Sequence, residues 1–125
     1  MDLALLIVDD ESSYLAMVCE YFGARGYKVH SAQEYEEAEA LLCKYDYSLV
    51  ITDLCLTAVQ ADEGLHLIDT IKEKSPQTKI ILLSGRATSA VHEEALKRGA
   101  HAVLGKPQPL DFINDVAKSL LEVRP

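Results

Sequence analysis

The chain has 125 residues, of which 49% are hydrophobic and 26% charged, and its formal net charge is −8. These values indicate one globular domain with a core of its own, and the acidity makes the chain a poor candidate for direct binding of nucleic acid. The longest apolar run, Leu3–Val8, is far too short to span a bilayer. The first residues lack the basic segment of a signal peptide, so we expect no membrane segment.

Three cysteines, Cys19, Cys43 and Cys55, are far apart and form no C-x-x-C pair. An odd number at such spacing argues against a disulfide framework or a zinc site. Reduced thiols favour a cytoplasmic location.

Short apolar runs along the chain predict five β-strands. Three of the runs are almost entirely apolar and do not alternate with polar residues, which is typical of strands covered on both faces, as in a parallel sheet. The predicted strands are Leu3–Val8, Lys28–Ser31, Ser48–Thr52, Lys79–Leu83 and Ala102–Leu104.

The segments after these runs carry apolar residues at helical spacing, which gives each helix one apolar face. The five stripes are Leu15–Phe22, Tyr35–Tyr45, Leu65–Ile71, Val91–Leu96 and Ile113–Leu121.

Residues that favour helix ends agree with this assignment. Ser31–Glu34 has the spacing of a capping box that would open the second helix. Gly26 and Gly99 each follow an arginine, as a glycine after a basic last turn should. Pro76 ends the third helix, and Pro109 occupies the expected first position of the fifth.

The alternation predicts an α/β fold of the (βα)₅ type over residues 1–125. Short connections and right-handed crossovers favour a doubly wound, five-stranded parallel sheet with helices on both faces. The common strand order for such a sheet is 2-1-3-4-5.

Polar residues follow four of the predicted strands, at the edge where such sheets bind ligands. Three carboxylates in one place would repel one another, and Mg²⁺, which prefers oxygen ligands, would relieve that repulsion. A lysine and a hydroxyl beside them suit the oxygens of a phosphoryl group, and an aspartate is an adequate nucleophile for phosphoryl transfer. The residues are Asp9 and Asp10, then Asp53, then Ser84, then Lys106.

Each of these residues also has an ordinary structural interpretation. The Asp9-Asp10 pair could cap the next helix, and Asp53 could be a turn residue. Ser84 belongs to a common loop dipeptide, and a lone Lys106 is more often a solvated charge. Only the ordered set at four strand ends favours the chemical interpretation.

Four short stretches carry a resemblance to a known family: Val8–Glu11, Ile51–Asp53, Leu83–Gly85 and Gly105–Pro107. In this order they resemble the receiver domain of bacterial response regulators (CheY-like), over essentially the whole chain. The resemblance implies a flavodoxin-like fold and a function in two-component signal transduction. It also implies that Asp53 accepts a phosphoryl group from a sensor histidine kinase or a phosphotransfer protein.

The resemblance assigns a role to each of the other residues as well. Asp9, Asp10, Asp53 and the backbone carbonyl of Cys55 would hold Mg²⁺. Ser84 would be the switch hydroxyl and Lys106 would contact the phosphoryl group. The Lys106–Pro107 peptide is typically cis in this family.

Two features depart from the family pattern. The stretch Thr57–Ala61 makes the loop after Asp53 longer than usual and lacks the usual proline, so we expect it to change partner choice or phosphate lifetime. Val103 stands where family members often carry a switch tyrosine or phenylalanine. His101 is two residues earlier and is expected to point to the other side, so we do not expect it to replace that ring. Arg86 is either a rate-setting residue near the phosphoryl group or a solvated side chain.

Other functions stay open at this point. We expect a signalling switch with self-catalysed phosphotransfer and autodephosphorylation, not a metabolic enzyme. The alternative is a receiver-fold interaction module that works without phosphorylation; a small hydrolase or flavin protein is disfavoured because no Gly-rich phosphate loop is present. We expect the chain either to act alone or to be the receiver part of a longer regulator. Homodimerisation through the fourth helix, fifth strand and fifth helix is common in the family.

Overall fold

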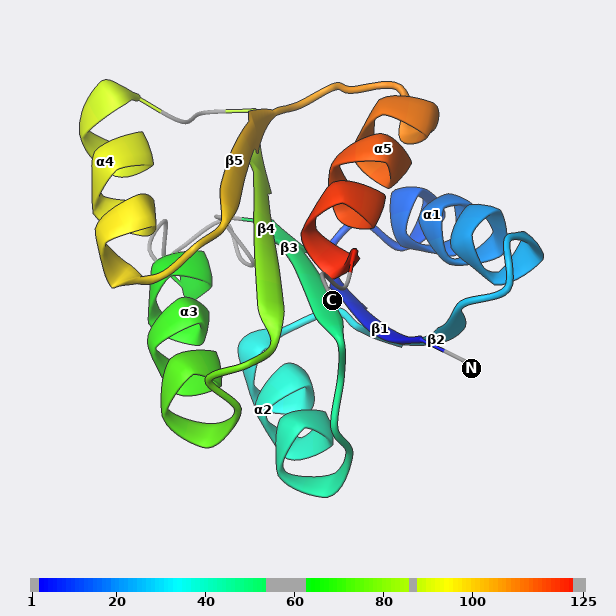
Figure 1. The fold of residues 1–125 in the computed structure, drawn as a ribbon, viewed down its shortest axis with the longest axis horizontal. Coiled ribbons are helices and arrows are strands. Elements are labelled where there is room, and N and C mark those ends of the chain that lie inside the picture. The colour runs from blue at the N-terminus through cyan, green and yellow to red at the C-terminus, as the bar shows by residue number, and fades with distance from the viewer. Residues whose placement is uncertain (1–2, 54–62, 86–87, 123–125) are drawn as a thin grey trace.

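The computed structural model describes residues 3–53, 63–85 and 88–122. Strands and helices alternate along the chain (Figure 1). The strands are β1 (Ala4–Val8), β2 (Lys28–Ala32), β3 (Leu49–Asp53), β4 (Lys79–Ser84) and β5 (Ala102–Gly105). The helices are α1 (Ser12–Ala24), α2 (Tyr35–Lys44), α3 (Glu63–Lys74), α4 (Ser89–Arg98) and α5 (Leu110–Leu121).

All five strands are parallel and lie in the order β2-β1-β3-β4-β5. Helices α1 and α5 cover one face of the sheet, and α2, α3 and α4 cover the other (Figure 1). The predicted doubly wound fold and its strand order are therefore confirmed.

The core has two halves, one on each face of the sheet. In β1, Leu6 and Val8 pack on the side of α2, α3 and α4, whereas Leu5 and Ile7 pack on the side of α1 and α5. All four side chains are at most 2% exposed. Because alternate residues of a strand point to opposite faces, a strand covered on both sides must be apolar throughout, which explains the continuous apolar runs in the sequence.

Most of the predicted helix ends are confirmed. Gly26 and Gly99 have φ of 96° and 123°, the left-handed region that favours glycine after a helix. Helix α3 ends at Lys74, two residues before Pro76. Pro109 directly precedes α5 instead of occupying its first position.

The predicted capping box at Ser31–Glu34 is wrong. Strand β2 continues to Ala32, which pairs with Val8 of β1, so Ser31 belongs to the sheet. The residue before α2 is Glu34, whose side chain makes no capping hydrogen bond. Instead, the Glu37 carboxylate accepts a hydrogen bond of 2.8 Å from the Gln33 backbone N–H. A carboxylate in the first turn thus stabilises the start of the helix.

No helix within the described ranges is long and apolar enough to cross a membrane.

Candidate phosphoryl-acceptor site

Three carboxylates meet where β1 and β3 end. Residues Val8 and Thr52 are paired neighbours in the sheet, so the residues that follow them emerge side by side. One carboxylate oxygen from each of Asp9, Asp10 and Asp53 lies within 4.8 Å of the others. This spacing and the all-oxygen donor set suit a hard divalent cation such as Mg²⁺.

The three acids differ in burial and in partners. Asp9 is only 2% exposed, and its Oδ1 accepts a hydrogen bond of 2.9 Å from the Glu11 backbone N–H. Asp10 is exposed, and Asp53 lies between these extremes. Since α1 begins at Ser12 after Glu11, the acids precede the capping position, and the helix-cap interpretation of Asp9 and Asp10 is not supported.

Lys106 supplies the positive charge of the site from the end of β5. Its Nζ donates hydrogen bonds to Asp9 Oδ2 at 2.6 Å and to Asp53 Oδ2 at 3.1 Å. Burial of the ammonium lowers the pKa of Lys106, but the hydrogen bonds to the two carboxylates outweigh that effect, so the pKa lies above its usual value. The ammonium therefore keeps its charge and offsets part of the repulsion among the acids.

Ser84 is the last residue of β4 and is 2% exposed. Its strand lies between β3 and β5, with Asp53 paired to Leu83 and Ser84 paired to Gly105. The Lys106 backbone N–H donates to the Ser84 carbonyl at 2.9 Å. The Lys106–Pro107 peptide is cis, as the resemblance to receiver domains implies. The sheet thus gathers all four strand ends at one edge.

Tyr14, in the first turn of α1, also belongs to this site, and the sequence analysis missed it. The Lys106 Nζ lies 4.5 Å from the centroid of its ring. Its hydroxyl is buried and has no hydrogen-bond partner in the described part of the chain. The only signal in the sequence was its position four residues after Asp10, one helical turn beyond the acids.

Several residues singled out in the sequence are not placed at the site by the structure. Cys55, Arg86 and the stretch Thr57–Ala61 lie outside the described residues. Val103 is partly buried and packs against the core beneath α2, α3 and α4. His101 lies at the opposite end of the sheet, where its Nδ1 accepts a hydrogen bond from the Ile80 backbone N–H.

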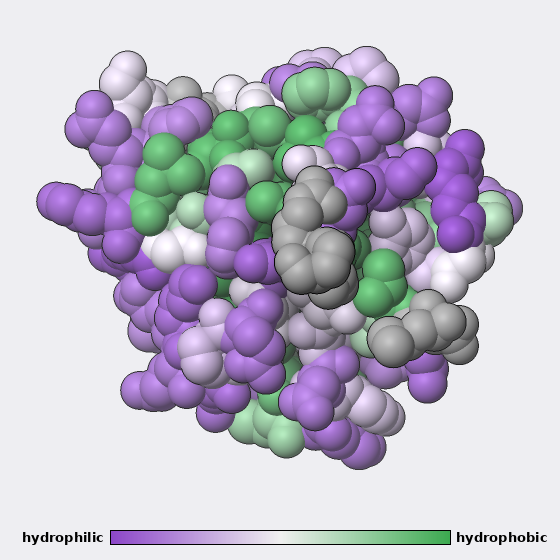
Figure 2. Space-filling view, in the orientation of Figure 1, coloured by the Kyte–Doolittle hydropathy of each residue, from purple (hydrophilic) through white to green (hydrophobic). Residues whose placement is uncertain are grey.

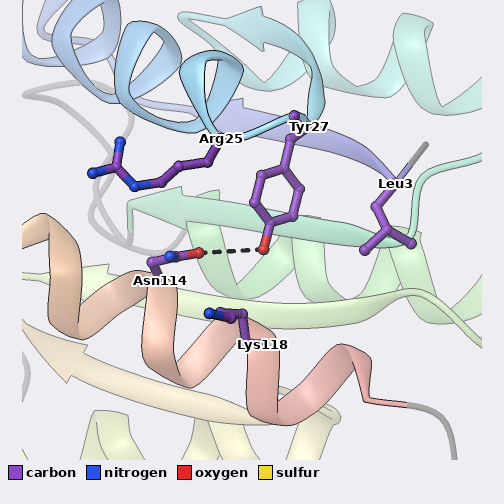
Figure 3. A pocket seen from close by; sticks show the side chains of 6 residues that line it. Leu3, Arg25, Tyr27, Asn114 and Lys118 are labelled. Atoms are coloured by element: carbon purple, nitrogen blue, oxygen red, sulfur yellow. Dashed lines mark hydrogen bonds between the residues drawn. The ribbon is translucent and has the colours of Figure 1, made fainter. Parts of the chain in front are cut away.

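A cavity of about 470 Å³ lies away from the acids, between the end of α1 and the face of α5 (Figure 3). Arg25 and Lys118 line it, and the Tyr27 hydroxyl donates to Asn114 Oδ1 at 3.2 Å beside them. None of the acidic residues lines this cavity, so its size does not identify the reactive site.

Residues 5–118 match the family model described as the response regulator receiver domain. The chain belongs to this family. Receiver domains are signalling modules of two-component systems and not classical enzymes, and they typically bind Mg²⁺ at an acidic cluster. Asp9, Asp10 and Asp53 form that cluster here.

Individual relatives agree with this assignment. The photosynthetic apparatus regulatory protein RegA of Rhodovulum sulfidophilum is 32% identical over 96% of this receiver domain, which covers 62% of RegA. A Burkholderia pseudomallei response regulator, solved with a phosphorylated aspartic acid, calcium ion and citrate, has a TM-score of 0.85 and 28% identity. That match covers 98% of this chain and 68% of the other.

A third relative is the beryllofluoride-activated NtrC4 receiver domain dimer, solved in solution. It has a TM-score of 0.84 and 26% identity, covering 94% of this chain and 95% of the other. Response regulators interact with histidine kinases and can dimerise. The chain spans 24% to 62% of the length of several curated regulators that it matches.

Proposed function

We propose that Asp53 accepts a phosphoryl group from a phosphohistidine of a sensor histidine kinase or a phosphotransfer protein. The observation that carries this proposal is the Lys106 ammonium, which is hydrogen-bonded to both Asp9 and Asp53 within a cluster of three carboxylates. A nucleophilic carboxylate, a fixed cation and a set of metal ligands are what phosphoryl transfer requires. The intact set disfavours the alternative of an interaction module that works without phosphorylation.

The reaction uses this chain's own side chains in distinct ways. An Asp53 carboxylate oxygen forms the new bond to phosphorus while the phosphorus–nitrogen bond of the phosphohistidine breaks and the imidazole leaves. Lys106 provides its point charge to a phosphoryl oxygen. Ser84, at the end of the neighbouring strand, provides the switch hydroxyl. Autodephosphorylation is the attack of water on the same phosphorus, which restores the Asp53 carboxylate.

Asp9, Asp10 and Asp53 would hold Mg²⁺, together with the backbone carbonyl of Cys55, which lies outside the described residues. When bound, the ion neutralises negative charge on the carboxylates and the phosphoryl oxygens. The oxygen spacing within 4.8 Å supports this assignment.

We also propose the extent, the location and the dimer contact of the domain. The receiver domain extends over residues 1–125, and the free thiols of Cys19 and Cys43 suit a cytoplasmic protein. A homodimer would use α4, β5 and α5, where apolar side chains gather over β5 (Figure 2). Leu96 of α4 and Phe112 of α5 are 44% and 43% exposed, which supports a contact there.

Labelling with radioactive acetyl phosphate in the presence of Mg²⁺ tests the role of Asp53. The wild-type chain should take up label that hydroxylamine removes, and Asp53→Ala should take up none. A matched control is Asp115→Asn, an exposed acid of α5, which should keep wild-type labelling. Undiminished labelling of Asp53→Ala would overturn the assignment.

A further inference from the structure

Tyr14 faces the acidic site from the first turn of α1. Its ring is partly buried and packs against the core on the side of α1 and α5. The Lys106 Nζ lies 4.5 Å from the ring centroid, within the range of a cation–π interaction. The ammonium therefore contacts an aromatic face as well as the Asp9 and Asp53 carboxylates.

The contact with Tyr14 restricts the conformations of the Lys106 side chain. A lysine side chain is long and flexible, and a charge paired only with carboxylates could follow either acid. The ring of Tyr14 occupies part of the space around Nζ and attracts the charge. Lys106 is thereby held beside Asp53, where it can meet a phosphoryl oxygen without a large rearrangement.

The hydroxyl of Tyr14 adds a second feature that ring packing does not explain. Within the described residues, it is the one buried side-chain polar atom with no hydrogen-bond partner. An unsatisfied buried polar group is costly, so proteins seldom retain one without a use. A phenylalanine would fill the same space without that cost.

The hydroxyl lies in the electric field of the reactive groups. Burial raises the pKa of Tyr14; Lys106 acts against that shift, while the charges of Asp9, Asp53 and Glu11 add to it. The phenol therefore keeps its proton and is a neutral donor. Since this hydroxyl donates to none of the described carboxylates, it is available to an oxygen of a phosphoryl group on Asp53.

We propose that Tyr14 is part of the phosphoryl site: its ring positions the Lys106 ammonium beside Asp53, and its hydroxyl donates a hydrogen bond to an oxygen of the phosphoryl group on Asp53. This inference rests on the proposed function of Asp53. It gives the site a third donor, in addition to Lys106 and Ser84, that stabilises the phosphorylated state.

Beryllofluoride, whose fluorines stand in for phosphoryl oxygens, is the probe that tests this role. Its affinity in the presence of Mg²⁺ is measured by ¹⁹F NMR for the wild type, Tyr14→Phe and Tyr14→Leu. Tyr14→Phe should bind about tenfold more weakly, since one hydrogen bond to a charged group is lost. Tyr14→Leu should bind more weakly still, because the ring that positions Lys106 is lost too.

Two further readouts separate this role from a structural one. Tyr14→Phe should unfold at the same or a higher urea concentration than wild type, because the substitution removes an unsatisfied buried group. The ¹³Cζ resonance of Tyr14, assigned by its loss in Tyr14→Phe, should shift when beryllofluoride binds. Tyr27→Phe is the matched control, because the Tyr27 hydroxyl bonds to Asn114 away from the acids, and its affinity for beryllofluoride should equal that of wild type.

The outcomes distinguish the two proposals. If the wild type binds beryllofluoride and Tyr14→Phe binds equally well, Tyr14 has no role in the site and the assignment of Asp53 stands. If the wild type does not bind, both proposals fall together. Weaker binding by Tyr14→Phe with an unshifted ¹³Cζ resonance would also overturn the direct hydrogen bond.

Discussion

At the scale of single residues, Asp9 shows how the site tolerates its own charge. A carboxylate that is 2% exposed has lost most of its hydration, and such a group is costly unless donors replace the water. The Glu11 N–H and the Lys106 ammonium each bond one of its oxygens. Because Lys106 also bonds Asp53, the same cation that compensates the burial of Asp9 stands next to the proposed phosphoryl acceptor.

Two glycines of the α1 region should respond oppositely to the same substitution. Gly26 has φ of 96°, so a side chain there meets backbone strain even though no atom lies near the new Cβ. We expect Gly26→Ala to lower the free energy of unfolding by about 1–2 kcal/mol. Gly23 is exposed within α1 and equally free of neighbours. Gly23→Ala should therefore raise the free energy of unfolding by about 0.5–1 kcal/mol.

Urea denaturation of both variants beside the wild type measures the two changes. The comparison isolates backbone conformation, because neither new methyl group makes a contact. A loss of stability in both variants, or in neither, would contradict the conformational explanation.

The residues of the site were predictable to different degrees. Asp9, Asp10, Asp53, Ser84 and Lys106 could be found because parallel strands deliver their last residues to one edge of the sheet. Tyr14 could not, since a tyrosine in an amphipathic helix has the same pattern whether it packs or binds. Its role depends on which way the first turn of α1 faces, and that angle changes by about 100° for each residue by which the helix start is misjudged.

At the scale of elements, the join between β4 and β5 depends on a histidine. The His101 backbone N–H donates to the Ile80 carbonyl at 2.8 Å, and the Ile80 N–H donates to His101 Nδ1 at 3.1 Å. The ring can accept this bond only while Nδ1 is unprotonated. Burial lowers the pKa of His101, and the nearby charges of Lys72 and Lys79 lower it further.

These contacts predict a pH dependence of stability with a definite sign. Because the pKa of His101 is lower in the folded chain than its ordinary value of 6.5, the unfolded chain binds the proton more readily. Stability is therefore full above about pH 6.5 and declines as the pH falls below that value toward the folded pKa. His101→Asn, whose amide oxygen can accept the same bond, should decline less.

Urea denaturation of the wild type and His101→Asn between pH 7.5 and 5.5 measures the difference. All other ionisable groups are the same in both proteins, so their effects cancel in the comparison. Parallel stability curves would show that His101 does not carry the effect.

Element boundaries show why local sequence signals can mislead. Ser31–Glu34 satisfies the spacing of a capping box, but the pairing of Ala32 with Val8 extends β2 through the first half of that motif. Pairing between strands is a long-range interaction that a four-residue pattern does not contain. The apolar runs and stripes predicted the elements and their order, because burial on both faces of the sheet imposes them along the whole chain.

At the scale of the whole molecule, the acidic site couples the stability of the fold to the binding of a cation. Folding brings Asp9, Asp10 and Asp53 from the ends of two strands into mutual contact distance, and their repulsion opposes the folded state. Lys106 offsets part of that repulsion. A divalent cation bound to the folded chain alone must then raise the free energy of unfolding, by about 1.4 kcal/mol at ten times its dissociation constant.

Thermal unfolding with and without Mg²⁺, at matched ionic strength, tests this coupling. The wild-type Tm should rise by several degrees with Mg²⁺. Asp10→Asn changes an exposed acid. Without Mg²⁺ it should be no less stable than wild type, because repulsion among the acids falls, and its Tm should rise much less when Mg²⁺ is added.

Asp46→Asn is the matched control. It makes the same substitution at an exposed residue before β3, at the opposite end of the sheet, and its Tm should rise with Mg²⁺ as much as that of wild type. An equal rise in Tm for all three proteins would place the cation elsewhere. If Asp10→Asn is at least as stable as wild type without Mg²⁺ but less stable with it, the repulsion among the acids and the binding of the cation share the same carboxylates.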